Sequence, residues 1–368
     1  MKIALFHPQI NNYGGGEYVC LVIAECLSAL HDVTVLVSSL PDVNRLQKFF
    51  SVDLAKVKFA VRPFANFVQK IPGIPSYRNS LQLKYLKDLD KFDIVIDTGT
   101  NGWFTQKLRA RTICYIHFPH FVKKHNWKQI TEPLLVNPKK AFKYDVLLCN
   151  SEFTKKHLAN FTDKDVSVVY PPVETAKIKP GKKSNIIVSV GRFTPEKKHD
   201  VMIRVFIDGN FKGWELHLIG SYQEGVGIYD SRYIEKLKSL AKGANVHLHM
   251  NMDHNDVLHF LERAKIYWHA RGFGETDPND FESFGITTVE AMAAGCMPIV
   301  INLGAQPEIV KHGESGYCWN SLQELISLTK KAMGGKNQTM IKSAIKQSKI
   351  YDLSIFREKI IKIVEGLG

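Results

Sequence analysis

Short apolar runs rich in valine and isoleucine recur along this chain, and loops and stretches of helical periodicity separate them. The runs are nearly continuous rather than alternating with polar residues, which predicts strands buried on both faces. Strands that alternate with helices in this way are typical of parallel sheets covered by helices on both faces. The chain is therefore predicted to be an α/β protein with doubly wound sheets.

The predicted strands fall into two series. The first series comprises 2–6, 32–38, 92–97, 111–117, 145–150 and 166–170, and the second comprises 185–191, 214–220, 246–250, 264–269 and 297–302. Between the series, Pro171 and Pro172 precede segment 177–184, which is rich in lysine, proline and glycine and predicts a linker. At 368 residues the chain is long enough for two domains. We expect them to face each other across a central cleft, with ligands outside the carboxyl ends of the strands.

The composition excludes several classes of protein. Hydrophobic residues make up 45% of the chain, which is an ordinary globular proportion. The first strand runs into His7 and Pro8 rather than into a signal-peptide core, and no apolar run approaches the roughly 20 residues that cross a bilayer. We therefore expect a cytoplasmic protein. Its six cysteines lack the paired spacing of a metal site and are expected to be reduced core residues.

The formal net charge of +13 is unevenly distributed, because segment 107–157 holds eleven Lys or Arg against three acidic residues. Such a surface can meet an anionic membrane, a phosphate-bearing acceptor or nucleic acid, or it can simply be solvated. Segment 64–78 interleaves aromatic, aliphatic and basic residues, and it is either a buried loop or a segment that enters a membrane interface. Because no nucleic-acid-binding signature accompanies the charge, we expect no nucleic-acid partner.

Segment 281–298 carries two glutamates, Glu282 and Glu290, on either side of a predicted helix start. Apolar residues recur at three to four positions from Ile286, so the helix is expected to begin near Gly285. The free N–H groups at such a start bind anions, and flanking carboxylates bind hydroxyls, as a nucleotide sugar requires. The alternative is that the two carboxylates only cap the helix or complement its dipole.

Three further groups follow predicted strands. Arg192 and Lys197 come after the first strand of the second series, and both cations can reach one diphosphate. Residues 14–16 are three glycines at the first strand-to-helix turn, where a phosphate or sugar can approach the backbone closely. His117 ends another strand of the first series. Each group also has an ordinary interpretation, as solvated charges, tight helix packing or a packed histidine.

Segments 268–275 and 281–310, together with 190–199, resemble the donor-site signature of the retaining glycosyltransferases of family 4, which have the GT-B fold. The resemblance implies two Rossmann-like domains and a C-terminal helix, 352–367, that returns to the first domain. It also implies an acceptor-binding domain at 1–171, completed by 352–368, and a donor-binding domain for the nucleotide sugar at 172–351.

The resemblance assigns roles to individual residues. Glu290 is expected to hold the ribose hydroxyls and Glu282 to contact the transferred sugar. The catalytic residues that it implies are Glu282, His117, Arg192 and Lys197. The donor-binding residues that it implies are Gly15, Gly16, Arg192, Lys197, Ser283, Phe284, Gly285, Ile286, Thr287 and Glu290. It implies no metal and no cofactor. The proline and the loop context of Asp277–Asp280 argue against a metal site in that segment. Lys198 is expected to point to solvent, and His247 and His249 to divide between core and surface.

Within the family, 14–17, 97–99 and 115–119 favour the mannosyltransferases that extend lipid-linked oligosaccharides. The expected donor is GDP-mannose or a UDP-hexose, and the expected acceptor is a glycan or a lipid-linked glycan at the cytosolic face of a membrane. A nucleotide-sugar epimerase of the same fold remains an alternative. A dehydrogenase is disfavoured, because Gly14-Gly15-Gly16 does not match the dinucleotide-binding spacing.

Overall fold

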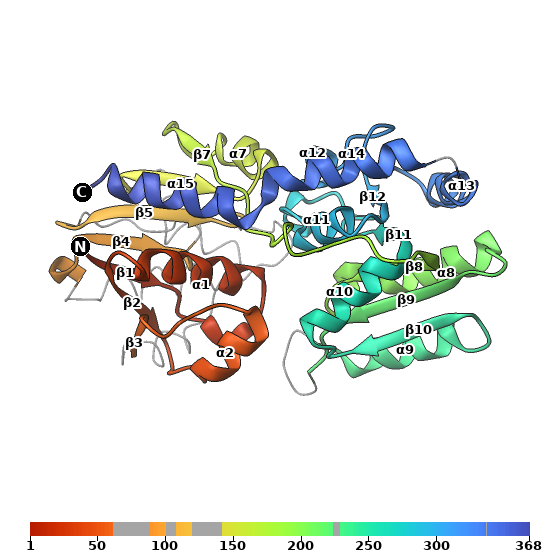
Figure 1. Ribbon diagram of the computed structural model, residues 1–368, viewed down its shortest axis with the longest axis horizontal. Helices are drawn as coiled ribbons and strands as arrows, with labels where there is room; N and C mark the ends of the chain where they lie inside the picture. The colour runs from red at the N-terminus through yellow and green to blue at the C-terminus, as the bar shows by residue number, and fades with distance from the viewer. Residues whose placement is uncertain (62–88, 101–107, 120–141, 224–228, 336) are drawn as a thin grey trace, which may run out of the picture. The chain divides into compact units, whose positions relative to one another are not determined.

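A computed structural model describes residues 1–61, 89–100, 108–119, 142–223, 229–335 and 337–368 of the chain. The described residues form two compact units, one of Met1–Pro172 with Ser354–Gly368 and one of Val173–Leu353. We call them the N-terminal unit and the C-terminal unit. Each unit contains one parallel β-sheet with helices packed against it (Figure 1). The predicted α/β class with two doubly wound sheets is confirmed.

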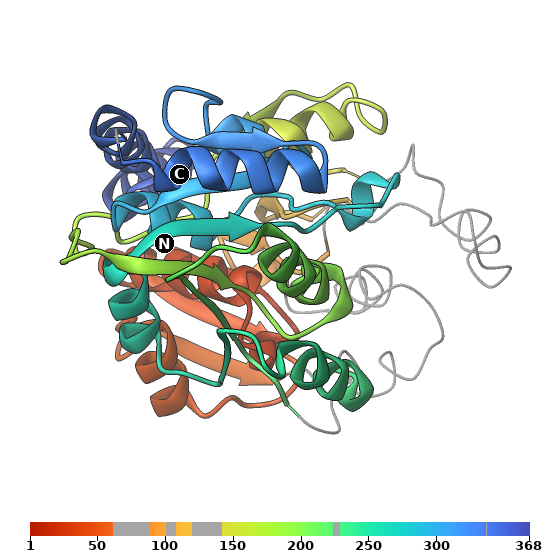
Figure 2. The same ribbon diagram turned by 90° about the vertical axis from the view of Figure 1, so that its right-hand side faces the viewer.

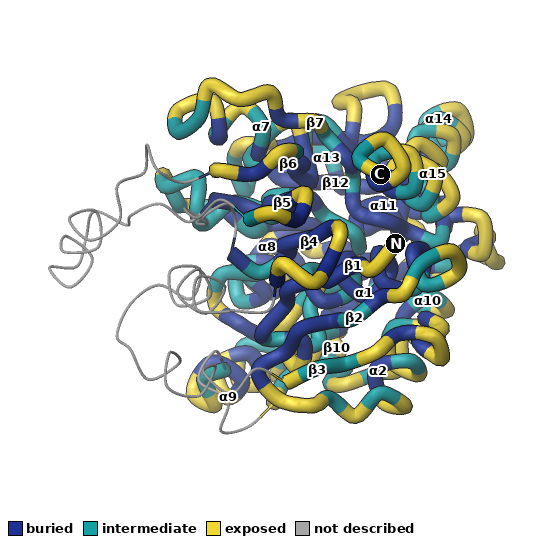
Figure 3. Tube along the Cα trace, turned by 90° about the vertical axis from the view of Figure 1, so that its left-hand side faces the viewer, coloured by how far each residue is buried: buried dark blue, intermediate teal, exposed yellow. Residues whose placement is uncertain are grey.

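The sheet of the N-terminal unit has seven strands in the order β3-β2-β1-β4-β5-β6-β7. Their bounds are β1 (Lys2–Phe6), β2 (Asp32–Val37), β3 (Lys58–Val61), β4 (Ile94–Asp97), β5 (Arg111–Ile116), β6 (Val146–Cys149) and β7 (Val166–Val168). The central strands are buried along almost their whole length, as the apolar runs predicted (Figure 3). The chain order reverses between β1 and β4, so this is the switch point at which α/β sheets bind ligands.

The sheet of the C-terminal unit has six strands in the order β10-β9-β8-β11-β12-β13, and all of them run in the same direction (Figure 2). Their bounds are β8 (Ser184–Val190), β9 (Glu215–Gly220), β10 (Val246–Met250), β11 (Ala264–His269), β12 (Met297–Ile301) and β13 (Tyr317–Trp319). The corresponding switch point lies between β8 and β11. This second sheet therefore repeats the topology of the first.

Helices cover both faces of the N-terminal sheet. They are α1 (Gly15–Ser28), α2 (Val43–Phe50), α7 (Glu152–Leu158) and α15 (Leu353–Glu365), with the short 3-10 helices η1 (Ile10–Asn12) and η2 (Leu89–Lys91). Leu158 of α7 joins the core on one face, whereas Phe356 of α15 packs edge-on against Tyr115 on the other. On that second face, Arg357 of α15 forms an ion pair with Glu25 of α1. The predicted return of the C-terminal helix to the first domain is confirmed.

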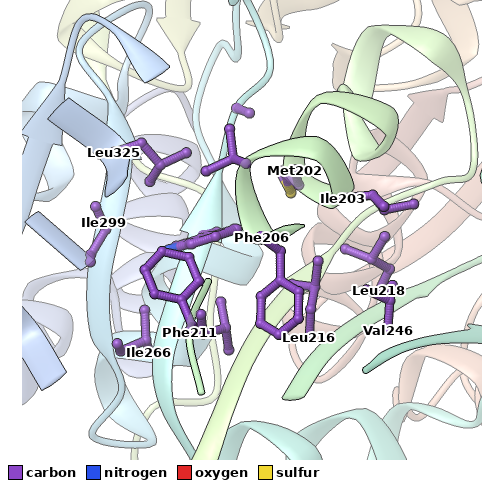
Figure 4. Close-up of a cluster of buried hydrophobic side chains, with 14 of the residues drawn as sticks. Met202, Ile203, Phe206, Phe211, Leu216, Leu218, Val246, Ile266, Ile299 and Leu325 are labelled. Atoms are coloured by element: carbon purple, nitrogen blue, oxygen red, sulfur yellow. The ribbon is translucent and has the colours of Figure 1, made fainter. Parts of the chain in front are cut away.

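Helices also cover both faces of the C-terminal sheet. They are α8 (His199–Gly209), α9 (Ser231–Ala241), α10 (His254–Arg263), α11 (Ile286–Ala293), α12 (Gln306–Ile309), α13 (Leu322–Met333) and α14 (Gln338–Ser348), with η4 (Pro195–Lys197), η5 (Pro278–Asp280) and η6 (Lys349–Tyr351). Apolar residues of α8, α9 and α13 pack in one cluster against the strands (Figure 4). Helices α10, α11 and α14 pack in a connected row that contacts β8, β11 and β12.

The predicted strands match the observed ones to within about two residues at each end, and the predicted helix at 352–367 corresponds to α15. Two strands were missed, β3 and β13. Both lie at the edge of their sheet and are only four and three residues long. Runs that short give too few residues for a period to be recognised.

Candidate active site

Helix α11 begins at the position that the sequence predicted, with Gly285 as its N-cap. Gly285 has φ +139°, and a Cβ there would lie 2.5 Å from Nε2 of Gln306, so the position requires glycine. The buried Gln306 amide donates to the Phe284 carbonyl at 2.7 Å, and its Oε1 accepts from the Thr288 hydroxyl at 2.9 Å. Gln306 thereby fixes the turn that presents the start of the helix.

Glu282, just before this turn, lies among three basic side chains. Its Oε2 is 2.6 Å from Nζ of Lys197 and 3.4 Å from Nε2 of His269, and its Oε1 is 3.4 Å from Nη1 of Arg271. Lys197 follows β8, whereas His269 ends β11 and Arg271 lies just beyond it. The four side chains therefore meet at the carboxyl ends of the two strands that flank the switch point.

Burial and opposite charges act against each other on the pKa values in this group. Burial raises the pKa of Glu282, but the charges of Lys197 and Arg271 outweigh burial and hold it well below its ordinary value. Burial lowers the pKa of Lys197, and Glu282 partly restores it. Burial also lowers the pKa of His269, so its ring is neutral near pH 7. The group is thus two cations around one carboxylate, with a surplus of positive charge.

Arg192 is placed differently from Lys197. Its side chain is 44% exposed and lies 3.7 Å from Glu196, whereas the Lys197 side chain is only 17% exposed. The backbone of Gly191 lies against the aliphatic part of Lys197, because a Cβ at Gly191 would be 3.2 Å from Cδ of that lysine. The structure thus places the Lys197 side chain against Glu282. The Arg192 side chain stays half-exposed, so its guanidinium can turn toward another partner on the solvent side.

The expectation that Lys198 points to solvent is wrong. Its Nζ lies 2.6 Å from Oε1 of Glu275, and the Lys198 side chain is largely buried. Lys198 has φ +58°, in the left-handed region, where it follows η4 and precedes α8. That backbone turn directs two neighbouring lysines to two different glutamates.

Glu290 lies in α11, in surroundings opposite to those of Glu282. The residue is buried, and its Oε1 is 3.4 Å from Nε2 of the half-exposed His254 at the start of α10. Burial raises the pKa of Glu290 above its ordinary value, His254 lowers it in part, and the charge of Glu174 adds to the rise. The two carboxylates of the motif are therefore held in electrostatically different states.

In the N-terminal unit, the glycine loop and His117 lie side by side. A Cβ on Gly16 would be 3.3 Å from Nε2 of His117, so the imidazole rests against the glycine backbone. Gly15 and Gly16 open α1, and the N-cap Gly14 donates its N–H to Oε2 of Glu17 at 2.9 Å. The loop is thus held by a capping interaction within α1.

His7 supports this loop from the end of β1. Its Nδ1 is 2.8 Å from the Thr98 hydroxyl and its Nε2 is 3.5 Å from Oε1 of Glu17. Burial opposes the charged ring, but Cys20 and Glu17 outweigh burial and raise the pKa of His7 to about 10. The sequence placed His7 only as the residue that breaks the first strand, and it gave no sign of this buried ion pair.

Residues 13–177 match the family described as Glycosyltransferase Family 4, and residues 173–349 match the family described as Glycosyl transferases group 1. A GDP-Man:Man(3)GlcNAc(2)-PP-Dol alpha-1,2-mannosyltransferase of Xenopus laevis is 30% identical, over 82% of this chain and 73% of that protein. The chain belongs to glycosyltransferase family 4. It is a hexosyltransferase, as the sequence predicted.

Other comparisons agree with this assignment. The glycosyltransferase is 22% identical to an enzyme of the same name from Dictyostelium discoideum, over 100% of this chain and 85% of that protein. Its fold is similar to that of the sucrose-phosphate synthase of Thermosynechococcus elongatus, with a TM-score of 0.79 and 15% identity over 100% of this chain and 99% of the other. It is also similar to HepE of Anabaena in complex with UDP and glucose, with a TM-score of 0.75 and 16% identity over 99% of each chain. The predicted GT-B fold is confirmed.

Sequence reasoning missed His269 and Arg271 of the glycosyltransferase as members of the site. Both were part of the matching segment, but neither received a role. Their position was the available signal, since residues that follow a strand at the switch point face the ligand. Asp277 accepts hydrogen bonds from the backbone and side-chain nitrogens of Asn279 and caps η5.

The prediction that His247 and His249 divide between core and surface is wrong. The two residues are two positions apart on β10, so their side chains point to the same face of the sheet. Both rings lie close to His217 of β9. Segment 64–78, for which a buried loop or a membrane-interface segment was predicted, lies wholly outside the described residues.

Proposed function

We propose that this glycosyltransferase transfers mannose from GDP-mannose to a glycan or lipid-linked acceptor, with retention of anomeric configuration. The observation that carries the proposal is the group of Lys197, Arg271 and Glu282 at the carboxyl ends of β8 and β11, next to the start of α11. A surplus of buried positive charge beside a helix N-terminus is suited to a diphosphate. Residues 172–351 would form the donor-binding domain.

In this proposal Lys197 and Arg192 neutralise the diphosphate as it departs. Lys197 is fixed by Glu282 and by the packing of its stem on Gly191, so it meets the developing charge without reorganisation. Arg192, which is half exposed, is free to turn onto a phosphate oxygen. Stabilisation of the leaving group lowers the barrier more than tighter binding of the whole donor would.

The two glutamates would divide the rest of the donor between them. Glu282 would accept from a sugar hydroxyl through Oε1, whose contact with Arg271 is long at 3.4 Å. Glu290 would accept from the ribose hydroxyls, because a buried carboxylate one turn into α11 gains most from such donors. The backbone N–H groups of Ser283, Phe284, Gly285, Ile286 and Thr287 would bind the phosphate and the sugar. The acceptor hydroxyl would pass its proton to the departing phosphate.

The N-terminal unit would supply the acceptor side. Gly15 and Gly16 would let the donor approach the backbone, and His117, which rests on Gly16, would reach the sugar or the acceptor. Residues 1–171 with 352–368 would form the acceptor-binding domain. The contact between Gly16 and His117 supports this assignment, because it brings together two predicted site residues that are 101 positions apart in the chain.

GDP-mannose is favoured over a UDP-hexose by the relatives. The enzymes that are 22% and 30% identical over most of the chain have GDP-Man in their names, whereas the structures with UDP are only about 16% identical and show the fold alone. A panel of GDP- and UDP-sugars tests the choice by the rise in melting temperature, since a ligand that binds the folded state stabilises it. GDP-mannose should raise the melting temperature most. If none of the sugar nucleotides raises it, the proposed donor site is refuted.

The role of the two glutamates can be tested with GDP alone. Glu290→Ala should weaken GDP binding more than Glu282→Ala, because GDP carries the ribose but not the sugar. Equal losses would contradict the division of roles.

Incubation of GDP-mannose without acceptor tests the epimerase alternative, since a free epimer would appear only if that alternative holds.

We further propose that the protein contacts the cytosolic face of an anionic membrane, where a lipid-linked acceptor is presented. Within the described residues, no helix has the length and apolarity needed to cross a bilayer. The basic excess of segment 107–157 supports contact at the surface. The protein should float with vesicles that contain anionic lipid at low salt, and float less as salt rises. Failure to bind them at low salt would refute the membrane contact.

A further inference from the structure

A cluster of histidines lies on one face of the C-terminal sheet, on the strands β9 and β10. Glu215 and His217 lie on β9, and His247 and His249 lie on the neighbouring edge strand β10. We call these four residues the histidine cluster. His217 and His247 are register partners in the parallel pair, and residues two apart on a strand share a face, so all four side chains project to one side.

The ligand atoms in this cluster are close together. Nε2 of His217 is 3.0 Å from Oε2 of Glu215, and Nδ1 of the same ring is 2.9 Å from Nε2 of His249. The ring centroids of His217 and His247 are 4.7 Å apart. One ligand atom from each of Glu215, His217 and His247 can be chosen so that all lie within 4.8 Å of one another.

This arrangement has the chemistry of a metal site. Imidazole and carboxylate are ligands that zinc prefers, and ligand atoms about 2.0–2.1 Å from a tetrahedral ion lie about 3.3 Å from each other. Glu215 and His217 already have that spacing, and the exposed His247 can turn to complete it. Nε2 of His249 is placed to accept a hydrogen bond from Nδ1–H of His217, and in that tautomer the Nε2 lone pair of His217 is left for the ion. Outer partners of ligating histidines have this role.

We propose that Glu215, His217 and His247 bind a divalent transition-metal ion, with Zn²⁺ as the best match. The fourth position would be taken by water, because Glu215 and His247 open to solvent. The ion would join the edge strand β10 to β9. Phe260 of α10 packs on the rings of both His217 and His249, so these two rings are held in place before an ion binds.

The proposal is tested with the whole chain and Zn²⁺ in competition with a chromophoric chelator. The wild type should bind one equivalent at this site, and His247→Gln and Glu215→Gln should each weaken binding about tenfold or more. His259→Gln is the matched control, since His259 forms an exposed pair with Glu262 at 3.2 Å but has no third ligand in the described structure. Its affinity should equal that of the wild type.

A second measurement guards against a folding defect. His247 is exposed, so His247→Gln should melt like the wild type without metal, and only the wild type and His259→Gln should gain stability with Zn²⁺. Co²⁺ should give the visible absorption of a site with nitrogen and oxygen ligands in the same two proteins. Absence of binding, or equal binding by wild type and His247→Gln, would overturn the proposal. Neither donor nor acceptor is used, so the result does not depend on the proposed function.

Discussion

Nζ of Lys197 lies 2.6 Å from Oε2 of Glu282, although the two residues are 85 positions apart in the chain. Both side chains are less than one-fifth exposed, and Arg271 approaches the same carboxylate from the other side. Burial lowers the pKa of Lys197, and the neighbouring carboxylate opposes that effect. The contact with Glu282 therefore favours the charged form of a lysine that burial disfavours.

Replacement of Lys197 should mainly affect catalysis. Lys197→Met is expected to lower kcat about 10²–10³-fold, because it removes a fixed cation from the departing diphosphate. Lys198→Met is the matched control, since that lysine pairs with Glu275 instead, and its kcat should stay within about fivefold of the wild type. Steady-state transfer from GDP-mannose measures both. Similar losses in the two variants would contradict the assignment of Lys197.

The two glutamates should differ in their effect on stability. Glu282→Gln leaves Lys197 and Arg271 without their shared anion, and we expect it to lower the free energy of unfolding by about 3 kcal/mol. Glu290→Gln removes a carboxylate that burial disfavours, so it should change that free energy by no more than about 1 kcal/mol, in either direction. Urea unfolding of both variants at neutral pH measures the difference. A larger loss of unfolding free energy for Glu290→Gln than for Glu282→Gln would contradict the different electrostatic surroundings assigned to the two carboxylates.

The same contrast predicts opposite pH dependences. The folded pKa of Glu282 lies well below its ordinary 4.5, so its stabilisation is present above that value and is lost as the pH falls toward the folded pKa. The gap in unfolding free energy between wild type and Glu282→Gln should therefore narrow as the pH falls below about 4.5.

For Glu290 the folded pKa is raised, so the folded state holds the proton more tightly than the unfolded state does. Wild type should then lose stability relative to Glu290→Gln as the pH rises above about 4.5. Unfolding curves of the three proteins across this range test both signs, and parallel curves would contradict them.

The contact between Gly16 and His117 predicts a steric effect that acts through the histidine. Gly16→Val should displace the imidazole and lower activity about 10–100-fold, as small misplacements of a catalytic group do. The double variant with His117→Ala should be no less active than His117→Ala alone, since the displaced group is already absent. Additive losses would show that Gly16 acts on the donor directly and not through His117.

Much of the fold was predictable because its signals are local. The apolar runs identified the central strands, and the spacing of Ile286, Val289, Met292 and Ala293 placed the start of α11 within a residue. The resemblance added the class of enzyme. The long, continuous pattern in 281–310 carried it, and the family match covers that segment. A periodic pattern needs only neighbouring residues to be recognised.

The arrangement of the side chains was less predictable. From the sequence, Lys197 and Glu282 were both predicted to be site residues. The lysine was predicted to bind a diphosphate, and its ion pair with the glutamate was not foreseen. The sequence could not separate Lys198 from Lys197, because the left-handed turn at Lys198 depends on how η4 meets α8. It also gave no signal for Gln306, whose amide closes the turn before α11 from the first position of α12.

By itself, then, the sequence determined the α/β class, the two series of strands, the start of the α11 helix and the family. Only the tertiary structure decided which charges meet: Glu282 with Lys197, His269 and Arg271, Glu290 with His254, and His217 with its neighbours on β9 and β10. The physical reason is that backbone periodicity is set by adjacent residues, whereas burial and ion pairing depend on strand order. The order of strands in a sheet brings together residues that are far apart along the chain.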